Sequence, residues 1–379
     1  MMNAVTSMVP QADPGAAYRA QKEAIDAAVA RVLASGWYIL GEEGRAFEAE
    51  FAAWLGPGQH AVGCANGTDA LMLALRGLGI GPGATVATVS HTAVATVAAI
   101  EMVGATPLLL DIDPETYTLD PDELLSVLEE PPPGLPPIRA VIPVHLYGQA
   151  ADLVPMLAAC RDAGVAVIED VSQAHGAMLN GAKLGTLGDV AAYSLYPTKN
   201  LGALGDAGVL STPDAALAER IGAIRQYGWK QRYVSDMAGV NSRLDEVQAA
   251  ILRVRLPLLD AANERRRAIA AAYDSALAHG PIAPPTRRTN ARHVFHQYVV
   301  RSDRRGDVQA RLKEQGIATA IHYPVPVHLQ PAYKGRVALG PAGCAETEAA
   351  AREIFSLPMF PELTEEQVAR VCAALGGLS

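Results

Sequence analysis

Short apolar runs alternate with stretches of helical spacing over roughly the first two thirds of the chain. The expected strands are 61–65, 85–89, 106–112, 140–145, 165–170, 190–195 and 207–212, and expected helices between them include 68–78 and 94–103. Strands that alternate with helices favour an α/β fold, with a largely parallel sheet covered on both faces. Ahead of this region, apolar positions at helical spacing predict helices over 15–35 and 44–55.

The pattern changes from about Leu244 onward. A long helical stretch is interrupted at Pro257, and a proline-rich segment at 129–137 predicts a surface loop. The expected elements after it are strand-like runs at 296–302 and 317–323, a helix near 307–315 and a final helix over 364–375. We therefore divide the chain into a large domain, 1–250, which includes the N-terminal helical segment, and a smaller α+β domain, 251–379.

The charge balance argues against nucleic acid as a partner. The chain of 379 residues has 31 Lys and Arg against 40 Asp and Glu, a formal net charge of -9. Its one run of three basic residues, 265–267, is expected on the solvated face of a helix. Residues 77–100 contain no charged side chain, but a Gly-Pro-Gly turn and several polar groups make this stretch a poor membrane helix, so we expect no membrane partner.

The four cysteines, Cys64, Cys160, Cys344 and Cys372, lie far apart and form no CxxC pair. This spacing suggests neither a zinc site nor a disulfide scaffold. We expect reduced thiols in a cytoplasmic protein and no metal site.

Two strand-to-helix turns carry residues suited to an anion and to a cation. Asn66, Gly67 and Thr68 follow the first strand, and a glycine turn that leads into a helix exposes backbone N–H groups to a phosphate. The same residues equally suit an ordinary helix cap. Asp170 ends an apolar strand, where a carboxylate needs a cation such as a protonated ring nitrogen, or hydrogen bonds from the backbone.

A lysine follows another of these strands. Lys199 lies in a mostly apolar, glycine-rich segment beyond Ser194, and burial there would lower the pKa of its amine and free it for a Schiff base with a carbonyl. Most lysines, however, are solvated surface charges. A fourth cluster with Asn241 and Ser242 is also explained by a loop and a helix cap. Because the ends of parallel strands meet at one edge of an open α/β sheet, the clusters indicate one site.

The residues of these clusters resemble the motifs of a known family. The phrases ANGTDAL, IEDVSQAHGA, SLYPTKNLGALGD, GVNSRLDEVQAAIL, IHYPVPVHLQ and FSLPMFPEL are similar to those of the DegT/DnrJ/EryC1/StrS sugar aminotransferases, in the same order and over nearly the whole chain. The resemblance implies the α/β fold of pyridoxal-phosphate aminotransferases of fold type I. In that fold a large domain with a mostly parallel, mixed sheet flanked by helices carries a smaller C-terminal α+β domain.

The resemblance also implies roles at a pyridoxal 5′-phosphate site. Lys199 would bind the cofactor as a Schiff base and then move a proton, while Asp170 would pair with the pyridinium nitrogen. The other cofactor-binding residues would be Gln173 at the 3-oxygen of the ring or packed beside it, Gly67, Thr68 and Ser194 at the phosphate, and Asn241 at the phosphate in a neighbouring subunit. The role of Asn241 implies a homodimer with shared active sites. His175 is expected behind the site, without direct contact with the cofactor.

One position departs from the family pattern. Where an aromatic side chain often covers the cofactor ring, this chain has Ala93, and a methyl group cannot cover a pyridine ring. His91, two residues earlier, is a candidate to bind the cofactor instead. A packed or hydrogen-bonded histidine explains His91 equally well.

The substrate assignment also rests on resemblance. SHTAVATVAAI and SLYPTKN resemble the subgroup that aminates C-3 of nucleotide-linked 3-keto-6-deoxyhexoses in deoxysugar biosynthesis. We expect a transaminase that takes the amino group of L-glutamate by a ping-pong mechanism and delivers it to a dTDP-linked sugar. The expected substrate contacts are Tyr196, His322 and Tyr323 at sugar hydroxyls, and Arg232 and Tyr233 at the nucleotide diphosphate unless they form a mobile solvent loop. His145 and His328 are equally well explained as core histidines.

Several alternatives stay open. The chain could aminate C-4 of a GDP-, UDP- or dTDP-4-keto-sugar, or act on a cyclitol. Sugar 3-dehydratases of the same fold replace the lysine with histidine, but Lys199 is present. A regulator that binds the cofactor without turnover would be signalled by loss of Lys199 or Asp170, and both residues are present.

Overall fold

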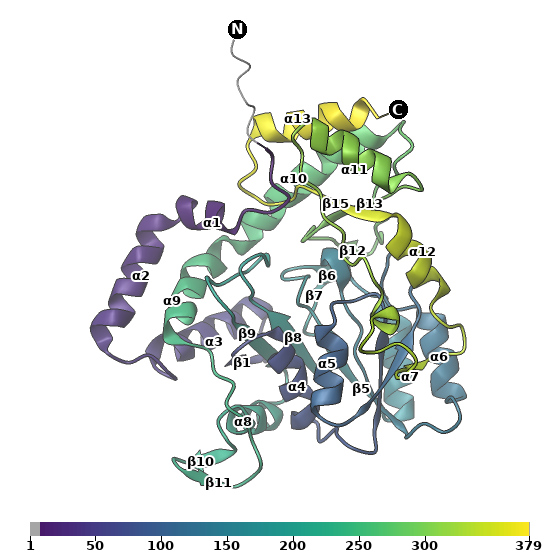
Figure 1. Ribbon diagram of the computed structural model, residues 1–379. Helices are drawn as coiled ribbons and strands as arrows, with labels where there is room; N and C mark the ends of the chain where they lie inside the picture. Colours follow the sequence, from purple (N-terminus) through teal and green to yellow (C-terminus); the bar gives the residue numbers. More distant parts are fainter. Residues whose placement is uncertain (1–7, 379) are drawn as a thin grey trace.

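An eight-stranded sheet runs through the centre of the computed structural model, which describes residues 8–378 (Figure 1). Its order is β1-β9-β8-β5-β4-β2-β3-β14, and β9 runs antiparallel to both of its neighbours, whereas the pairs from β8 to β14 are parallel. The strands are β1 (His60–Cys64), β2 (Thr85–Val89), β3 (Thr106–Leu110), β4 (Ile138–Val141), β5 (Ala166–Asp170), β8 (Val190–Ser194), β9 (Gly208–Thr212) and β14 (Ala338–Leu339). The predicted α/β fold with a mostly parallel, mixed sheet is confirmed.

Helices cover both faces of this sheet because both faces are apolar. Along β8, Val190 and Ala192 pack into one buried cluster, while Ala191 and Tyr193 pack into another on the opposite face. The first cluster lies under α4 (Gly67–Gly77), α5 (Ala95–Met102) and α8 (Ala215–Ile224). The second lies under α3 (Glu42–Leu55), α6 (Pro121–Glu129), α7 (Leu153–Ala163) and α9 (Glu246–Arg255).

A smaller region of helices and a two-stranded sheet lies above the large sheet in Figure 1. It consists of α10 (Leu259–Leu277), β13 (Tyr298–Arg301), α11 (Arg305–Glu314), α12 (Ala345–Glu353), β15 (Ile354–Leu357) and α13 (Glu365–Gly376). Its core also takes in Val9 from the beginning of the described chain. The expected boundary between 250 and 251 falls inside α9, and β14 returns from this region to the edge of the large sheet.

The remaining elements are short or lie at the periphery. They are α1 (Pro14–Ala20), α2 (Lys22–Ser35), β6 (Met178–Leu179), β7 (Ala182–Lys183), β10 (Trp229–Gln231), β11 (Val234–Ser235), β12 (Ala291–Arg292) and the 3₁₀ turns η1 (Leu146–Gly148), η2 (Leu256–Leu258) and η3 (Val327–Leu329). In the described part of the chain, no helix combines the length and the apolarity that crossing a bilayer requires.

Two expected elements differ from the structure. The helix expected over 15–35 is divided into α1 and α2 at Gln21. The strand expected over 317–323 does not form a ladder: Ile317 bridges Val9 and Ala320 bridges Ser356 as isolated pairs. The alternating pattern there reflects single contacts with two different neighbours, Val9 and the edge of β15 that does not pair with β13.

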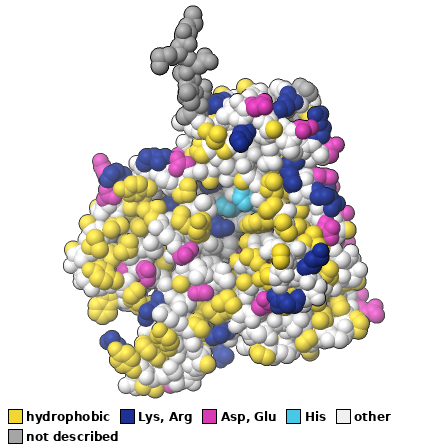
Figure 2. Space-filling view, viewed as in Figure 1, with side chains coloured by type: hydrophobic (Ala, Val, Ile, Leu, Met, Phe, Trp, Pro, Cys, Tyr) yellow, Lys and Arg dark blue, Asp and Glu magenta, His cyan; other side chains and the backbone are white. Residues whose placement is uncertain are grey.

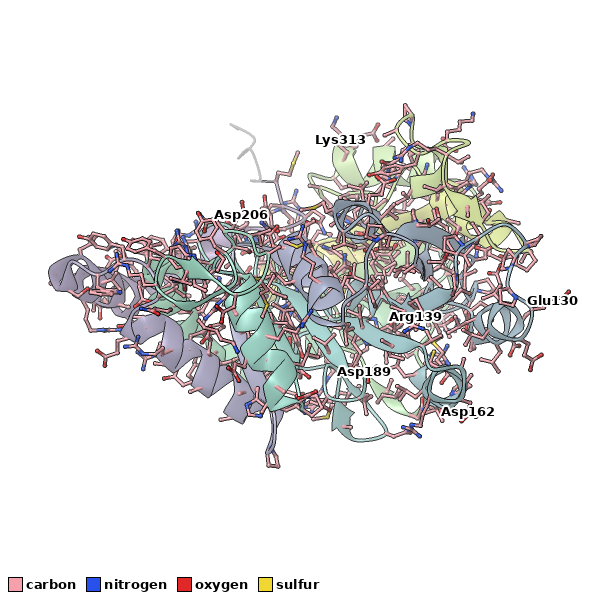
Figure 3. The ribbon with its side chains drawn as sticks, turned by 90° about the horizontal axis from the view of Figure 1, so that it is seen from below. Glu130, Arg139, Asp162, Asp189, Asp206 and Lys313 are labelled. Atoms are coloured by element: carbon pink, nitrogen blue, oxygen red, sulfur yellow. The ribbon has the colours of Figure 1, made fainter. Side chains whose placement is uncertain are left out.

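The two ends of the large sheet can be told apart in Figure 3 by two aspartates. Asp189 precedes β8 and therefore marks the amino ends of the parallel strands, whereas Asp206 precedes the reversed β9 and marks their carboxyl ends. Open α/β sheets bind ligands at the carboxyl ends. The polar clusters found in the sequence follow β1, β5 and β8, so this edge is where they meet.

Candidate active site

A pocket of about 510 Å³ lies at the carboxyl edge of the sheet. This volume is in the range of small-molecule sites. Its lining includes Asn66, Gly67, Thr68, Asp69, Thr92, Ala93, Thr96, Asp170, Ser172, Gln173, Ser194, Tyr196, Thr198, Lys199 and Asp206. The space-filling view shows this face hollowed near its centre, with a histidine and a basic side chain visible inside (Figure 2). The structure therefore brings most of the predicted cofactor residues into one cavity.

One wall of the pocket is an anion cradle at the beginning of α4. Asn66 caps the helix by accepting the Asp69 N–H at 2.8 Å. Gly67 and Thr68 are in the first turn, where backbone N–H groups have no acceptor inside the helix. A Cβ at Gly67 would lie 2.6 Å from the Ser194 Cβ, so only glycine lets β8 approach the turn this closely. The helix dipole, the free N–H groups and the Ser194 hydroxyl together suit a phosphate.

Asp170 lies at the end of β5 with 4% of its surface exposed. One carboxylate oxygen accepts the Ser172 N–H at 3.1 Å, and the other is 3.4 Å from the Thr96 hydroxyl. These are neutral donors, and a carboxylate so deeply buried gains most from a cationic partner. A protonated ring nitrogen in the pocket would supply that charge.

Lys199 shares the pocket with Asp170. Burial lowers the pKa of the Lys199 amine to about 8, and the Asp170 carboxylate opposes this shift. An amine with this pKa is partly neutral near pH 7, which is the form that attacks a carbonyl. The segment is fixed locally, because the Lys199 N–H donates to the Tyr196 carbonyl at 2.8 Å.

Buried amides hold this lysine segment from behind. The Asn200 side chain donates to the Asn263 side chain at 2.8 Å and to the Val294 carbonyl at 3.1 Å. Asn263 in turn donates to the His175 carbonyl at 2.8 Å. His175 is fully buried, its ring packs on Tyr193, and burial lowers its pKa to about 3. His175 thus lies behind the pocket as a neutral packing residue.

A tyrosine network lies behind Gln173, and Gln173 is its member that lines the pocket; Tyr323 and His322 lie outside the lining. Gln173 accepts the Tyr147 N–H at 2.8 Å and donates to the Tyr323 hydroxyl at 3.0 Å. Burial raises the pKa of Tyr323 to about 12, with Asp170 adding to the shift and the Gln173 bond opposing it, so this hydroxyl stays protonated. His322 is bonded through Nδ1 to the Ser356 hydroxyl at 2.8 Å, and burial together with Lys199 lowers its pKa.

The two candidates for covering the cofactor ring lie in different places. Ala93 lines the pocket, whereas His91 is 1% exposed and lies outside the lining. The His91 Nε2 is 2.8 Å from the Tyr147 hydroxyl, and burial lowers the pKa of the ring to about 4. His91 is therefore a neutral member of the tyrosine network.

The remaining predicted substrate residues divide into two groups. Tyr196 lines the pocket and is 51% exposed. Arg232 and Tyr233 lie in the β10–β11 hairpin, with the guanidinium 4.9 Å from the ring centroid, and Tyr233 is 73% exposed. Asn241 is exposed as well. The structure brings none of these last three into the pocket of their own chain.

The other two histidines weighed in the sequence are satisfied inside the protein. His145 accepts the Ala151 N–H at Nδ1, 3.0 Å, so its Nε2 carries the proton and donates to Glu169 at 3.2 Å. Glu169 also accepts three backbone N–H groups, and although burial opposes ionisation, the His145 and backbone bonds lower its pKa. His328 is bonded to Ser90 and Glu348.

Two serines of the predicted clusters, Ser172 and Ser242, received no role at the site from the sequence, and the structure supplies one for each. Ser172 links the two key strands, because its N–H donates to Asp170 and its hydroxyl accepts the Ser194 N–H at 3.2 Å. Ser242 donates to Asp69 at 2.7 Å and so ties the loop beside Asn241 to the anion cradle. Both serines lie within phrases recognised in the sequence, but the sequence does not indicate which partners their side chains have. Ser242 bonds to a residue that precedes it by more than half the large domain.

Comparisons with known proteins show which proteins the chain resembles. The profile of the DegT/DnrJ/EryC1/StrS aminotransferase family matches residues 19–376. The chain is 46% identical to a dTDP-3-amino-3,4,6-trideoxy-alpha-D-glucose transaminase of Streptomyces venezuelae, over 98% of this chain and 96% of that protein. It is 44% identical to a pleiotropic regulatory protein of Geobacillus stearothermophilus, over 95% of each. The solved structure of S. venezuelae DesV in complex with a ketimine intermediate matches with a TM-score of 0.93 and 46% identity, covering 98% of both chains.

Proposed function

Because the chain belongs to the DegT/DnrJ/EryC1/StrS aminotransferase family, whose enzymes depend on pyridoxal 5′-phosphate, we propose that it transfers the amino group of L-glutamate to C-3 of a dTDP-linked 3-keto-6-deoxyhexose. The observation that carries the proposal is the pocket in which a lysine amine of lowered pKa shares a cavity with a buried carboxylate and an anion cradle. The C-3 position and the dTDP carrier are supported by the 46% identity to a transaminase named for such a sugar.

The residues of the pocket fit the cofactor. Gly67, Thr68 and Ser194 would hold its phosphate, where a side chain at 67 would fill the cradle. Asp170 would hold the ring nitrogen, and Gln173 would lie beside the ring. When bound, the cofactor supplies an aldehyde that accepts the amino group and a ring that withdraws electrons from the reacting carbon.

The chain's own groups then bind, orient and move protons. Lys199, with a pKa near 8, can both take and return a proton at Nζ near neutral pH. Asp170 is held in place by Ser172 and Thr96. Its negative charge stabilises the protonated form of a ring nitrogen bound beside it. Tyr323 offers a protonated hydroxyl to a sugar oxygen. One pocket serves donor and acceptor in turn, which is the basis of ping-pong kinetics.

We propose a homodimer in which Asn241, Arg232 and Tyr233 complete the pocket of the neighbouring subunit. All three lie outside their own pocket, and large apolar side chains are exposed around them. The exposed fractions are 63% for Trp37, 49% for Tyr38, 39% for Tyr227 and 50% for Val234. Hydrophobic side chains gather over α2 and the β10–β11 hairpin in Figure 2, as is typical of an interface.

The substrate proposal is tested with a panel of nucleotide keto-sugars. The purified enzyme is incubated with pyridoxal 5′-phosphate, L-glutamate and each sugar, and product mass and the position of the amine are determined by mass spectrometry and NMR. We expect amination of the dTDP-3-keto-6-deoxyhexose at C-3. Amination at C-4, or preference for a GDP- or UDP-sugar, would select the corresponding alternative, and cofactor binding without turnover on any sugar would favour a regulator.

The shared site is tested by mixing two inactive variants. Lys199→Ala and Asn241→Ala homodimers are each expected to lose activity. If Asn241 acts on the neighbouring pocket, the mixed dimer contains one pocket with both residues intact, so unfolding and refolding the two together restores up to about a quarter of wild-type activity. No recovery, despite mixed dimers seen by native mass spectrometry, would place Asn241 in its own pocket.

A further inference from the structure

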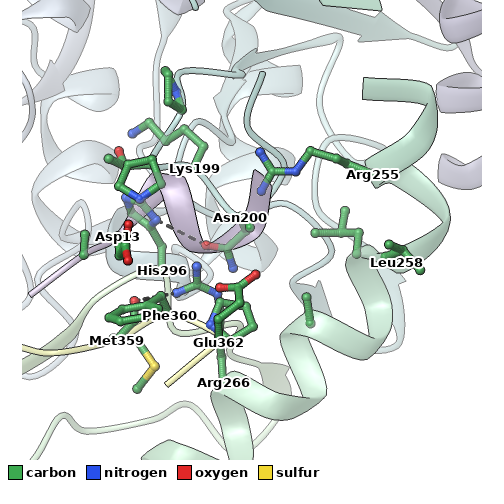
Figure 4. Close-up of a pocket in the computed structure, with 18 of the residues that line it drawn as sticks. Asp13, Lys199, Asn200, Arg255, Leu258, Arg266, His296, Met359, Phe360 and Glu362 are labelled. Atoms are coloured by element: carbon green, nitrogen blue, oxygen red, sulfur yellow. Dashed lines mark hydrogen bonds between the residues drawn. The ribbon is translucent and has the colours of Figure 1, made fainter. Parts of the chain in front are cut away.

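A second, smaller cavity lies on the other side of the Lys199 segment (Figure 4). Its volume is about 50 Å³, against ~10–15 Å³ for one water, so it has room for a small polyatomic ion. Thr198 and Lys199 line both this cavity and the large pocket. The other polar residues that line it are Asp13, Gln21, Asn200, Arg255, Arg266, His296, Gln297 and Glu362. We call it the rear cavity.

Arg266 is the most buried charge in its wall. The sequence predicted a solvated face for this arginine, but only 5% of its surface is exposed. Its guanidinium donates to the carbonyls of Phe295 at 3.2 Å and Met359 at 2.9 Å, and within residues 8–378 its Nε has no hydrogen-bond partner. Burial lowers the pKa of Arg266 to about 10, which leaves it charged at neutral pH. The hydrogen bonds that Arg266 makes within the described residues go to uncharged carbonyls, so no directly bonded carboxylate offsets its charge.

Arg255 approaches the same cavity from the end of α9. It donates to the Gly202 carbonyl, and burial lowers its pKa, with Glu362 opposing the shift. In Figure 4 the guanidinium groups of Arg255 and Arg266 both extend toward the space between α10 and the Lys199 segment. Neither arginine is among the ion pairs found in residues 8–378.

The acidic residues of the cavity do not balance these two charges. Asp13 is bound by Arg19 at 2.5 Å and by the Ala16 N–H at 3.1 Å. Glu362 raises the pKa of both cavity arginines but forms no hydrogen bond or ion pair with either in the described chain. A buried cation without a directly bonded counter-ion is costly, and Glu362 acts on the two arginines only through space. The cavity thus has the charge, the size and the donors for an anion.

We propose that the rear cavity is a carboxylate site, in which Arg255 and Arg266 bind one small carboxylate group in competition with Glu362. Planar guanidinium groups match the two oxygens of a carboxylate. The carboxylate belongs either to a free small organic acid or to the amino donor, whose amino group reacts at Lys199 on the other side of the same segment. The second source rests on the proposed function, whereas the first does not.

Occupation of this site is transmitted to the lysine segment through one short path. His296 lines the rear cavity, and its Nδ1 is 3.2 Å from the side-chain oxygen of Asn200, the residue after Lys199. Burial, Lys199 and Arg266 together lower the pKa of His296 well below its usual value. An anion beside Arg266 reduces the positive field at His296 and Asn200.

The test measures thermal unfolding of the cofactor-loaded enzyme against sodium acetate concentration, without any sugar substrate. Arg255→Met removes one donor, Glu362→Gln removes the competing charge, and Lys313→Met, on the exposed face of α11, is the control for general charge effects. We expect acetate to raise the melting temperature of the wild type and the control alike. Its apparent affinity should fall about tenfold in Arg255→Met and rise about threefold in Glu362→Gln. The same acetate response in all four proteins would overturn the proposal.

Kinetics then identify the source of the carboxylate. If the amino donor uses the site, acetate competes with L-glutamate, and Arg255→Met raises the KM for L-glutamate while the KM for the sugar is unchanged. If a free organic acid uses it, acetate still stabilises the enzyme in the thermal assay but does not compete with L-glutamate. Because the thermal assay needs no turnover, its failure is separate from failure of the proposed function.

Discussion

Lys199 lies between two hollows of opposite character. The large pocket in front of it is built from the ends of β1, β5 and β8 and is lined by three carboxylates, Asp69, Asp170 and Asp206. The rear cavity is about a tenth of that volume and is built from helices and loops. Its two guanidinium groups form no ion pair with any described residue, although Glu362 lines the same cavity. The front favours a cation at the ring-binding position, whereas the rear favours an anion. A single lysine segment separates these two environments, so substitutions can change the residues of one cavity and leave those of the other in place.

Removing the amine between the two hollows should have the largest effect. We expect Lys199→Ala to lower kcat by at least about 10³-fold, because the group that we propose to bind the cofactor covalently and to move the proton is lost. Loss of the visible absorbance of the holoenzyme and steady-state amine transfer are the measurements. Lys313→Ala, at an exposed position, is the control. Turnover within tenfold of wild type would show that the front pocket is not the cofactor site that we propose.

The anion cradle of the front pocket can be filled by one methyl group. In Gly67→Ala the new Cβ would meet the Ser194 Cβ at 2.6 Å. Overpacking of this kind costs about 1–3 kcal/mol, so we expect cofactor affinity to fall by about five- to 150-fold, measured by fluorescence titration of the apoenzyme. The matched control is Gly222→Ala in α8, where the added Cβ meets nothing within 4 Å. Equal affinity in the two variants would show that the phosphate binds elsewhere.

The lowered pKa of the lysine gives the capture of cofactor a pH dependence. Because the pKa lies near 8, the neutral, reactive amine is the minor form at pH 7 and the major form at pH 9. We expect the rate of cofactor capture by the apoenzyme to rise about tenfold over this range, with a midpoint near 8, by stopped-flow absorbance. Asp170→Asn removes the charge that holds this pKa up, so its midpoint should move to lower pH. A midpoint above 10 would mean that the amine is solvated.

The smallest expected effect concerns the uncovered face of the front pocket. Ala93→Phe places a ring where the pocket has a methyl group, and aromatic stacking contributes about 0.5–1.5 kcal/mol. We expect cofactor affinity to rise two- to tenfold while the acetate response of the rear cavity stays unchanged. His91→Asn is the companion variant, and it should leave cofactor affinity within twofold, since His91 lies outside the pocket lining. A large loss in that variant would restore His91 as a cofactor ligand.

The two hollows also differ in how much the sequence predicted. Asp170, Ser194 and Lys199 could be grouped in advance, because parallel strands carry whatever follows them to one common edge. The same periodicity located β2 at its observed residues and the other central strands within a few. Family resemblance added the roles of these residues but no distances.

The rear cavity could not be predicted in this way. Arg266 stands in a run of three arginines that reads as a solvated helix face, and it becomes buried because α10 packs against Phe295 and Met359, which are far away in the sequence. Tyr147, the centre of the tyrosine network, adopts a left-handed backbone with φ 61° that no local residue preference indicates. Such positions depend on which distant segments meet.

The bridge made by Asn263 has a mechanical consequence. This side chain of α10 is attached at one end to Asn200 and at the other to the backbone at His175, and both of those residues belong to loops at the edge of the sheet. Any rocking of the upper helices over the sheet must therefore pull on the residue next to Lys199. A change in the angle between the upper helices and the sheet would therefore reach Lys199 through the Asn263–Asn200 hydrogen bond and the peptide bond that joins Asn200 to Lys199.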